Sequence, residues 1–230
     1  MPPVEEILAT AELLREAMGA APRKALGDPV GGLVLAILSQ NTNDRNRDLA
    51  FRRLRGRFRS WEEVAEASPR EVEEAISVAG LFKVKASRIL SCLKSLKSHE
   101  GRVSLDHLRA LSMEQAQDEL LGFPGVGVKT ARCVLLFEFG LPAFPVDTHV
   151  LRVCKRLGWL PPGASADKAH ELLQGEIPPD LVYSLHLHLI QVGRLYCRPR
   201  SPRCEKCPVR PRCAAFKRAQ ILPSEVPGET

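Results

Sequence analysis

The sequence has no long hydrophobic run, no repeat of solenoid length and no low-complexity tract. Its longest apolar stretch is LVLAIL at residues 33–38, which is far shorter than the roughly 20 residues of a membrane-spanning helix. The first residues, MPPVEEIL, lack the basic start and the apolar run of a secretory signal peptide. We therefore expect a cytoplasmic protein without membrane contact, whose seven cysteines are thiols or metal ligands rather than disulfides.

Alternation of apolar and polar residues, which is typical of half-buried strands, is also scarce. Apolar residues recur at helical spacing instead, so the pattern predicts an all-α protein built from many short helices. Helix starts are indicated at Asp28, at Ser68 and at Ser60, where Glu63 completes the pattern of a capping box. Later helices are expected at 112–121, 127–139, 148–157, 165–174 and 180–195.

The charge of the chain is modestly positive. Lys and Arg together number 33 and Asp and Glu 27, for a net charge of +6 over 230 residues. This excess suggests a polyanionic partner. The arginine-rich stretch at 45–59 spreads its charges around a helix axis, and we interpret it as a solvated helix rather than a binding surface.

Four cysteines near the C-terminal end have the spacing C-x6-C-x2-C-x5-C. A loop this short lets four thiolates converge on one metal centre. The common zinc signature has two C-x2-C pairs and this loop has one, so the spacing leaves both zinc and an iron–sulfur cluster open. The four cysteines are Cys197, Cys204, Cys207 and Cys213.

The cysteine loop is also rich in arginine. A loop held by a metal centre would fix the direction of its cations, and we expect Arg200 and Arg203 to contact phosphates. The remaining cysteines stand in helical segments and are interpreted as core residues: Cys92, Cys133 and Cys154.

A glycine-rich turn, GFPGVGVKTA, occupies residues 122–131. Gly125 and Gly127 flank Val126 and allow a tight turn that can approach a ligand closely. The helix that follows offers free N–H groups at its start, which form an anion site. Lys129 lies in the first turn of that helix, where the helix dipole already disfavours a cation. The residues alone favour a solvated lysine at this position.

Three segments together carry a more specific signal: LGFPGVGVKTA, then PVDTHVLRV, then the four-cysteine loop. In this order and spacing the chain resembles the endonuclease III family, which are base excision DNA glycosylases of the helix-hairpin-helix superfamily. The resemblance extends back to LSQNTND at 38–44 and VAGLF at 78–82, and it covers about residues 28–215.

The resemblance implies a fold of two all-α domains. One is a helical bundle carrying the hairpin, at residues 28–142. The other combines 1–27 with 143–217 and holds a [4Fe-4S] cluster on the four cysteines. Residues 218–230 would form a C-terminal tail.

The resemblance also assigns the chemistry. Lys129 matches the lysine that attacks C1′ of the damaged nucleotide and forms a Schiff base, after which β-elimination nicks the strand. Asp147 matches the aspartate that assists this nucleophile. By its position alone, Asp147 is the N-cap of the next helix, and the two roles are compatible. His149 is expected to be a packed polar residue without a catalytic role.

A glycosylase must turn its target base out of the stack and fill the gap that remains. Leu81 matches the family's intercalating residue, whereas its alternative is an ordinary core leucine. The second filler of the family is a glutamine. In LSQNTND, Gln40 comes one position early and Asn41 occupies the matching position, so either residue could enter the duplex.

The resulting hypothesis is a bifunctional glycosylase and abasic-site (AP) lyase that removes oxidised pyrimidines from duplex DNA. We expect a nucleoid-associated monomer. One alternative is a monofunctional mismatch or uracil glycosylase, although such relatives lack a lysine at the position of Lys129. Another is a non-catalytic DNA-binding module with a structural metal.

Overall fold

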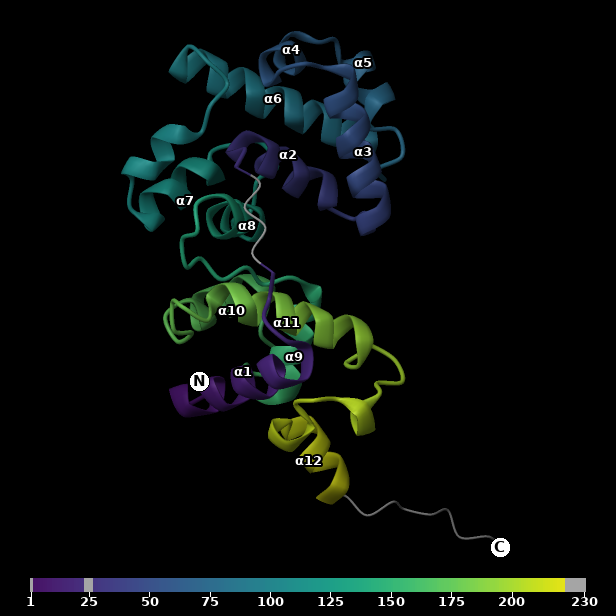
Figure 1. Cartoon of the computed structure of the whole chain (residues 1–230), viewed down its shortest axis with the longest axis vertical. Coiled ribbons are helices and arrows are strands. Elements are labelled where there is room, and N and C mark those ends of the chain that lie inside the picture. Colours follow the sequence, from purple (N-terminus) through teal and green to yellow (C-terminus); the bar gives the residue numbers. More distant parts are fainter. Residues whose placement is uncertain (1, 23–26, 222–230) are drawn as a thin grey trace, which may run out of the picture. The chain divides into compact units, whose positions relative to one another are not determined.

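The computed structural model describes residues 2–22 and 27–221. Within these ranges the chain forms twelve α-helices, three short 3₁₀ helices and no strand, which confirms the all-α prediction. The chain divides into two compact units (Figure 1). We call Lys24–Pro145 the bundle unit, and Met1–Arg23 with Val146–Thr230 the cysteine unit. No helix in the described part of the chain has the length and hydrophobicity needed to cross a membrane.

The bundle unit is built around one apolar helix, α2, which packs against α3, α6 and α8 (Figure 1). Close packing depends on Gly32, because a Cβ added there would lie 2.4 Å from Cγ of Glu138 on α8. The helices of this unit are α2 (Pro29–Ser39), α3 (Asp44–Arg57), α4 (Trp61–Glu66), α5 (Pro69–Ala75), α6 (Phe82–Glu100), η1 (Asp106–Ala110), α7 (Met113–Leu121) and α8 (Val128–Glu138).

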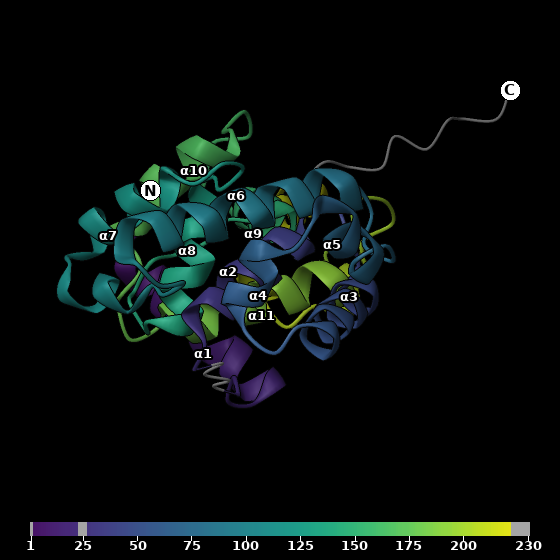
Figure 2. The same ribbon diagram turned by 90° about the horizontal axis from the view of Figure 1, so that it is seen from above.

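Three of the helix starts confirm the capping residues expected from sequence. The Asp28 carboxylate accepts a hydrogen bond from Gly31 N–H at 2.9 Å, and Ser68 forms a complete capping box. Ser60 caps α4, but the predicted box is wrong in one half: the Glu63 carboxylate accepts from the N–H of Arg59 and not from that of Ser60. Figures 1 and 2 show α4 and α5 beside α6, on which both pack.

The cysteine unit joins the two ends of the chain. Its centre is α9, which packs on α10, α11 and α12, while α1 covers α11. The helices of this unit are α1 (Val4–Met18), α9 (Thr148–Leu157), α10 (Ala166–Gln174), α11 (Val182–Leu195), η2 (Cys204–Lys206), η3 (Arg210–Arg212) and α12 (Ala214–Ile221). The expected tail at 218–230 begins inside α12, and its residues 222–230 lie outside the described part of the chain.

Candidate functional site

The hairpin between α7 and α8 is a tight turn in which one glycine is required. Val126 N–H donates to the Phe123 carbonyl at 3.1 Å, and Gly125 has a φ of 78°. A Cβ on Gly125 would also lie 2.3 Å from Cδ of Arg88. Gly127 is different, because its backbone is extended and a Cβ there would meet nothing within 4 Å. The open space outside Gly127 therefore suits the close approach of a ligand.

The hairpin exposes Pro124 and the backbone of its two glycines, and it buries its larger apolar side chains. Phe123 and Val126 are buried and belong to the apolar core of the bundle unit. Gly127 is the N-cap of α8 and offers no side chain to its first N–H groups. Free N–H groups and the positive end of a helix dipole, both found at the start of α8, are features that favour an anion.

Lys129 is the second residue of α8 and is partly exposed. The next residues turn inward, since Thr130 and Ala131 are both buried. The packing of α8 on α2 and α7 therefore holds the backbone of Lys129 rigidly, while its side chain keeps access to the surface.

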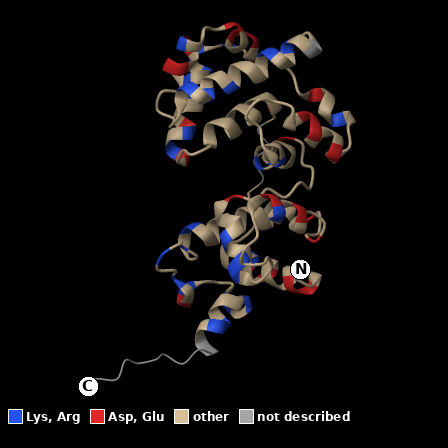
Figure 3. Ribbon diagram, turned by 180° about the vertical axis from the view of Figure 1, so that it is seen from behind, with Lys and Arg blue, Asp and Glu red and all other residues tan. Residues whose placement is uncertain are grey.

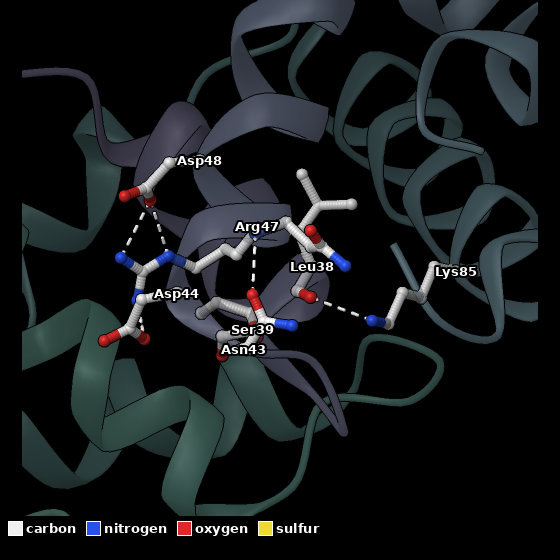
Figure 4. Close-up of polar contacts among 9 residues, drawn as sticks. Leu38, Ser39, Asn43, Asp44, Arg47, Asp48 and Lys85 are labelled. Carbon is white, nitrogen blue, oxygen red and sulfur yellow. Dashed lines mark hydrogen bonds and ion pairs between the residues drawn. The ribbon is translucent and has the colours of Figure 1, made fainter. Parts of the chain in front are cut away.

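The loop that follows α2 is held by a buried lysine. Lys85 on α6 is 1% exposed, and its Nζ donates to the Leu38 carbonyl at 2.8 Å (Figure 4). It also donates to the Thr42 hydroxyl. Burial, and then the nearby charge of Arg88, lowers the pKa of Lys85. A cation at this carbonyl is favourable because it faces the negative end of the α2 dipole.

Gln40 and Asn41 lie in this loop and have different environments. The Gln40 Oε1 accepts from Arg88 at 2.6 Å. Its Nε2 donates to the Gly125 carbonyl at 3.1 Å and to the Thr130 hydroxyl at 3.4 Å. Asn41 is exposed, with a φ of 50°. The structure thus engages Gln40 internally and leaves Asn41 at the surface.

The start of α3 is fixed by polar contacts. Asn43 is the N-cap and accepts from Asn46 N–H at 2.9 Å. Arg47 pairs with Asp44 at 3.0 Å and with Asp48 at 2.8 Å (Figure 4). Asp44, the last residue of LSQNTND, therefore has a structural contact within α3.

Leu81 is not a core residue, so that alternative from the sequence is wrong. Its side chain is 59% exposed and its φ is 58°, at the turn just before α6. The loop of Leu81 adjoins that of Asn41, since a Cβ on Gly80 would lie 3.3 Å from the Asn41 carbonyl oxygen. Leu81 and Asn41 are thus two exposed side chains on adjacent loops of one unit.

In the cysteine unit, Asp147 is the N-cap of α9, as its position in the sequence predicts. Its Oδ1 accepts from Val150 N–H at 2.7 Å. The preceding residue is also held, because Val146 N–H donates to Nε2 of the buried His170 at 2.9 Å. Two hydrogen bonds therefore orient the backbone on either side of the Asp147 side chain.

The helix that begins after Asp147 also contacts the cysteine loop. Arg152 Nε donates to the Cys197 carbonyl at 2.7 Å, and its guanidinium lies 3.1 Å from His149 Nδ1. His149 packs tightly on α11, because a Cβ added to Gly193 of that helix would lie 2.7 Å from the Cβ of His149. These contacts give His149 a packing role.

The four loop cysteines line one cavity of about 250 Å³. Arg156 of α9 donates to Cys197 Sγ at 3.4 Å and to the Arg198 carbonyl at 2.7 Å. Burial, and also the neighbouring thiols, raises the pKa of Cys207 to about 11. In the described part of the chain, no group of three or more His, Cys, Asp or Glu side chains is arranged to hold a metal ion. The cavity wall nevertheless contains Cys197, Cys204, Cys207 and Cys213 together.

The cysteine loop carries its cations on the outside. Arg200 and Arg203 are exposed, and Figure 3 shows Lys and Arg along the segment that follows α11. Two neighbours form ion pairs within the unit, Arg210 with Glu205 and Arg212 with Glu6.

A family comparison identifies the chain. The model of the HhH-GPD superfamily, described as base excision DNA repair protein, matches residues 34–179. The chain belongs to this superfamily. Endonuclease III of Thermotoga maritima is 34% identical over 209 residues, which cover 90% of this chain and 93% of that protein. This member of the HhH-GPD superfamily is thus similar to endonuclease III over nearly its whole length.

Two further relatives of this HhH-GPD protein extend the comparison. A protein of Arabidopsis thaliana named as a DNA glycosylase is 41% identical over 164 residues. These are 71% of this chain, which spans only 56% of that relative's length. The solved structure of a trapped endonuclease III–DNA covalent intermediate has a TM-score of 0.81 and 28% identity, and the match covers 96% of this chain and all of that one.

Several contacts of this HhH-GPD chain escape sequence analysis. Lys85 leaves a signal, because it falls on the apolar face of its helix between Phe82 and Ile89. The sequence gives no signal for the contacts of Arg88 and His170, because an arginine on a long helix and a histidine on an amphipathic helix are both common. Their partners are distant in sequence and only the fold brings them together.

Proposed function

We propose that this protein is a bifunctional DNA glycosylase and AP lyase that removes oxidised pyrimidines from duplex DNA. The observation that carries the proposal is the place of Lys129. It stands in the first turn of α8, directly after a hairpin whose two large apolar side chains, Phe123 and Val126, are buried and whose glycines are exposed. The similarity to endonuclease III over 90% of the chain supports the same assignment.

Lys129 Nζ is the nucleophile in this proposal. The neutral amine attacks C1′ of the damaged nucleotide, and the bond from C1′ to the base breaks. The base leaves with the electron pair of that bond and is protonated. The amine loses a proton and the sugar ring opens, which gives a Schiff base between Nζ and C1′. Loss of a proton from C2′ then expels the 3′ phosphate and nicks the strand. Exclusion of water by the bound duplex favours the neutral amine.

Asp147 assists this attack. Its Oδ1 caps α9, and we assign to the other carboxylate oxygen the removal of a proton from the nucleophile. The negative charge also stabilises the positive charge that develops on the sugar as the base departs. The hydrogen bond from Val150 N–H holds the Asp147 carboxylate, and the bond from Val146 N–H to His170 holds the backbone just before it.

The bundle unit supplies most of the DNA surface in this proposal. The backbone of Gly125, Val126 and Gly127 and the first N–H groups of α8 bind a phosphate. The two exposed side chains on adjacent loops, Leu81 and Asn41, fill the gap left by the extruded base. Arg200 and Arg203 of the cysteine unit add phosphate contacts.

We further propose that the four loop cysteines hold a [4Fe-4S] cluster. They fit this group because all four line one cavity and Arg156, which donates to Cys197 Sγ, offsets the negative charge of thiolates. When bound, the cluster supplies metal–thiolate bonds that crosslink the loop. The chain's own arginines around it then have fixed directions for phosphate contact.

Borohydride trapping on duplexes with a panel of lesions tests the proposed function. We expect a covalent complex on oxidised pyrimidines and on abasic sites, and a nicked strand without borohydride. A monofunctional glycosylase would release the base without a trapped complex, and a DNA-binding module would shift the duplex without product. Either result would overturn the proposal. Asp147→Asn should keep the cap of α9 and lose most of the turnover.

A further inference from the structure

Two loops of the bundle unit, the hairpin and the loop of Gln40, meet at one side chain, Arg88. Its stem lies under the hairpin, where Cδ stands 2.3 Å from the position of a Cβ on Gly125. Its guanidinium donates to Gln40 Oε1 at 2.6 Å. Arg88 stands on α6, two helical turns after the loop that carries Leu81.

Gln40 connects Arg88 to the hairpin and to the start of α8. With Oε1 accepting from Arg88, its amide must present Nε2 to the hairpin, where it donates to the Gly125 carbonyl and the Thr130 hydroxyl. Thr130 is the neighbour of Lys129 in the first turn of α8. One glutamine therefore joins the hairpin and the nucleophile's helix to the loop that carries Asn41.

We propose that the hydrogen-bonded pair of Arg88 and Gln40, called the latch below, fixes the hairpin to the loop of Asn41. The phosphate-binding hairpin, Asn41 and Lys129 then keep fixed positions relative to one another before DNA binds. Arg88 is then a positioning residue and Asn41, not Gln40, enters the duplex. The inference rests on the proposed function for the roles of Asn41 and Lys129. The latch itself rests on hydrogen bonds within the bundle unit.

The hydrogen bonds of Gln40 hold its side chain inside the bundle unit. Gln40 could reach into DNA only by giving up a charge-assisted hydrogen bond and two further bonds, and it would leave the Gly125 carbonyl without that donor. Asn41 gives up nothing comparable, because its side chain is already exposed and its backbone already holds a positive φ. Positioning of a nucleophile is sensitive to shifts of about 1 Å, so a loosened hairpin should slow chemistry.

Five variants test the latch. Arg88→Leu and Gln40→Leu each remove one half, and the double variant removes both. Arg88→Lys keeps a cation that can still donate to Gln40. Asn41→Ala removes the proposed gap filler alone. Arg102→Leu is the matched control, since Arg102 is an exposed arginine in a turn of the same unit.

Two measurements are needed, and the first is independent of catalysis. Hydrogen exchange of residues 122–130 in the free protein should be about tenfold faster in Arg88→Leu and Gln40→Leu, and unchanged in Asn41→Ala and Arg102→Leu. The second is the single-turnover excision rate with each of four opposite bases. It should fall about tenfold in both latch variants with the opposite-base pattern kept, whereas Asn41→Ala should change the pattern.

The double variant should be no slower than the slower single variant, because both changes break the same connection. Arg88→Lys should recover part of the loss. Unchanged hairpin exchange in Arg88→Leu would overturn the latch, and so would a changed opposite-base pattern in Gln40→Leu alone. If the wild type excises nothing, the proposed function fails while the exchange data still decide the latch.

Discussion

The buried imidazole of His170 accepts a hydrogen bond from the backbone N–H of Val146, with 2.9 Å between the two nitrogens. The bond ties α10 to the residue just before Asp147, 24 positions earlier in the chain. It also specifies the tautomer, because Nε2 must be unprotonated to accept. A histidine remote from the chemistry thus orients a residue that the proposed mechanism needs.

Replacing His170 with phenylalanine should remove this acceptor and leave a buried N–H without it. We expect a loss of about 1–3 kcal/mol of unfolding free energy and a lower turnover. His170→Gln, which can still accept, should recover part of both. Urea unfolding and single-turnover rates measure the two effects, with Lys168→Ala on the exposed side of α10 as control. Equal turnover in the phenylalanine variant and the wild type would contradict the positioning role.

Replacing Lys129 with glutamine should keep DNA binding and abolish chemistry. The hairpin backbone and the arginines remain, so a gel shift with an abasic-site analogue should be unchanged. Borohydride trapping and strand nicking should both vanish, because the amide cannot attack C1′. If the variant is still trapped at the wild-type rate, another residue is the nucleophile and the mechanism is wrong.

Glu138 should make the protein less stable as the pH rises. Burial, and then the negative charge of Asp28, raises the pKa of this 9% exposed carboxyl from 4.5 to about 7, against a smaller opposing effect of Arg109. The folded chain therefore holds the proton more tightly than the unfolded chain. The contribution of protonated Glu138 to the free energy of unfolding is fully present below about pH 4.5 and is lost as the pH rises through about 7.

At about 1.4 kcal/mol per pKa unit, the shift corresponds to roughly 3 kcal/mol. Glu138→Gln should flatten this decline, so the variant should gain stability over the wild type between pH 5 and pH 8. Urea unfolding at several pH values measures it. Asp118→Asn, which removes an exposed carboxylate from α7 of the same unit, is the control. Parallel pH profiles for Glu138→Gln and the wild type would refute the assignment.

Binding to undamaged duplex should weaken steeply as salt increases. The slope of log K against log salt is negative, and each phosphate contact that is lost reduces its magnitude by about 0.9. Arg200→Ala and Arg203→Ala should each flatten the slope by about that amount, and Arg70→Ala, on the exposed surface of α5, should not. A slope that stays the same in both loop variants would place the DNA surface elsewhere.

Protein purified without oxygen should be brown and contain about four irons per chain. Cys204→Ser should remove the iron and weaken DNA binding more than it lowers the helical circular dichroism, because the loop lies at the edge of the helical packing. Metal analysis and a duplex titration provide the two readouts. Stoichiometric zinc without iron in the wild type would exclude the cluster.

Local sequence signals sufficed for most of the helices, although not for α12. Caps, turn glycines and the apolar period act within a few residues, so segments expected at 148–157, 165–174 and 180–195 are observed as α9, α10 and α11 within two residues at each end. The same holds for Gly125, whose turn is formed by its immediate neighbours. The capping box at Ser60 was wrong in one half because Glu63 could reach either of two adjacent N–H groups, and side-chain geometry chose Arg59.

Tertiary structure alone decided which side chain of a pair stays inside. Gln40 and Asn41 are adjacent and carry the same amide, so no local pattern separates them. Gln40 finds its partners 48 and 85 residues further along, at Arg88 and Gly125, and Asn41 is left exposed. For Leu81 the sequence left the core leucine open as an alternative to the intercalating residue, and the turn before α6 excludes it by leaving the side chain 59% exposed. Burial is set by contacts between distant segments, and a local sequence pattern does not identify the distant residue that a side chain will contact.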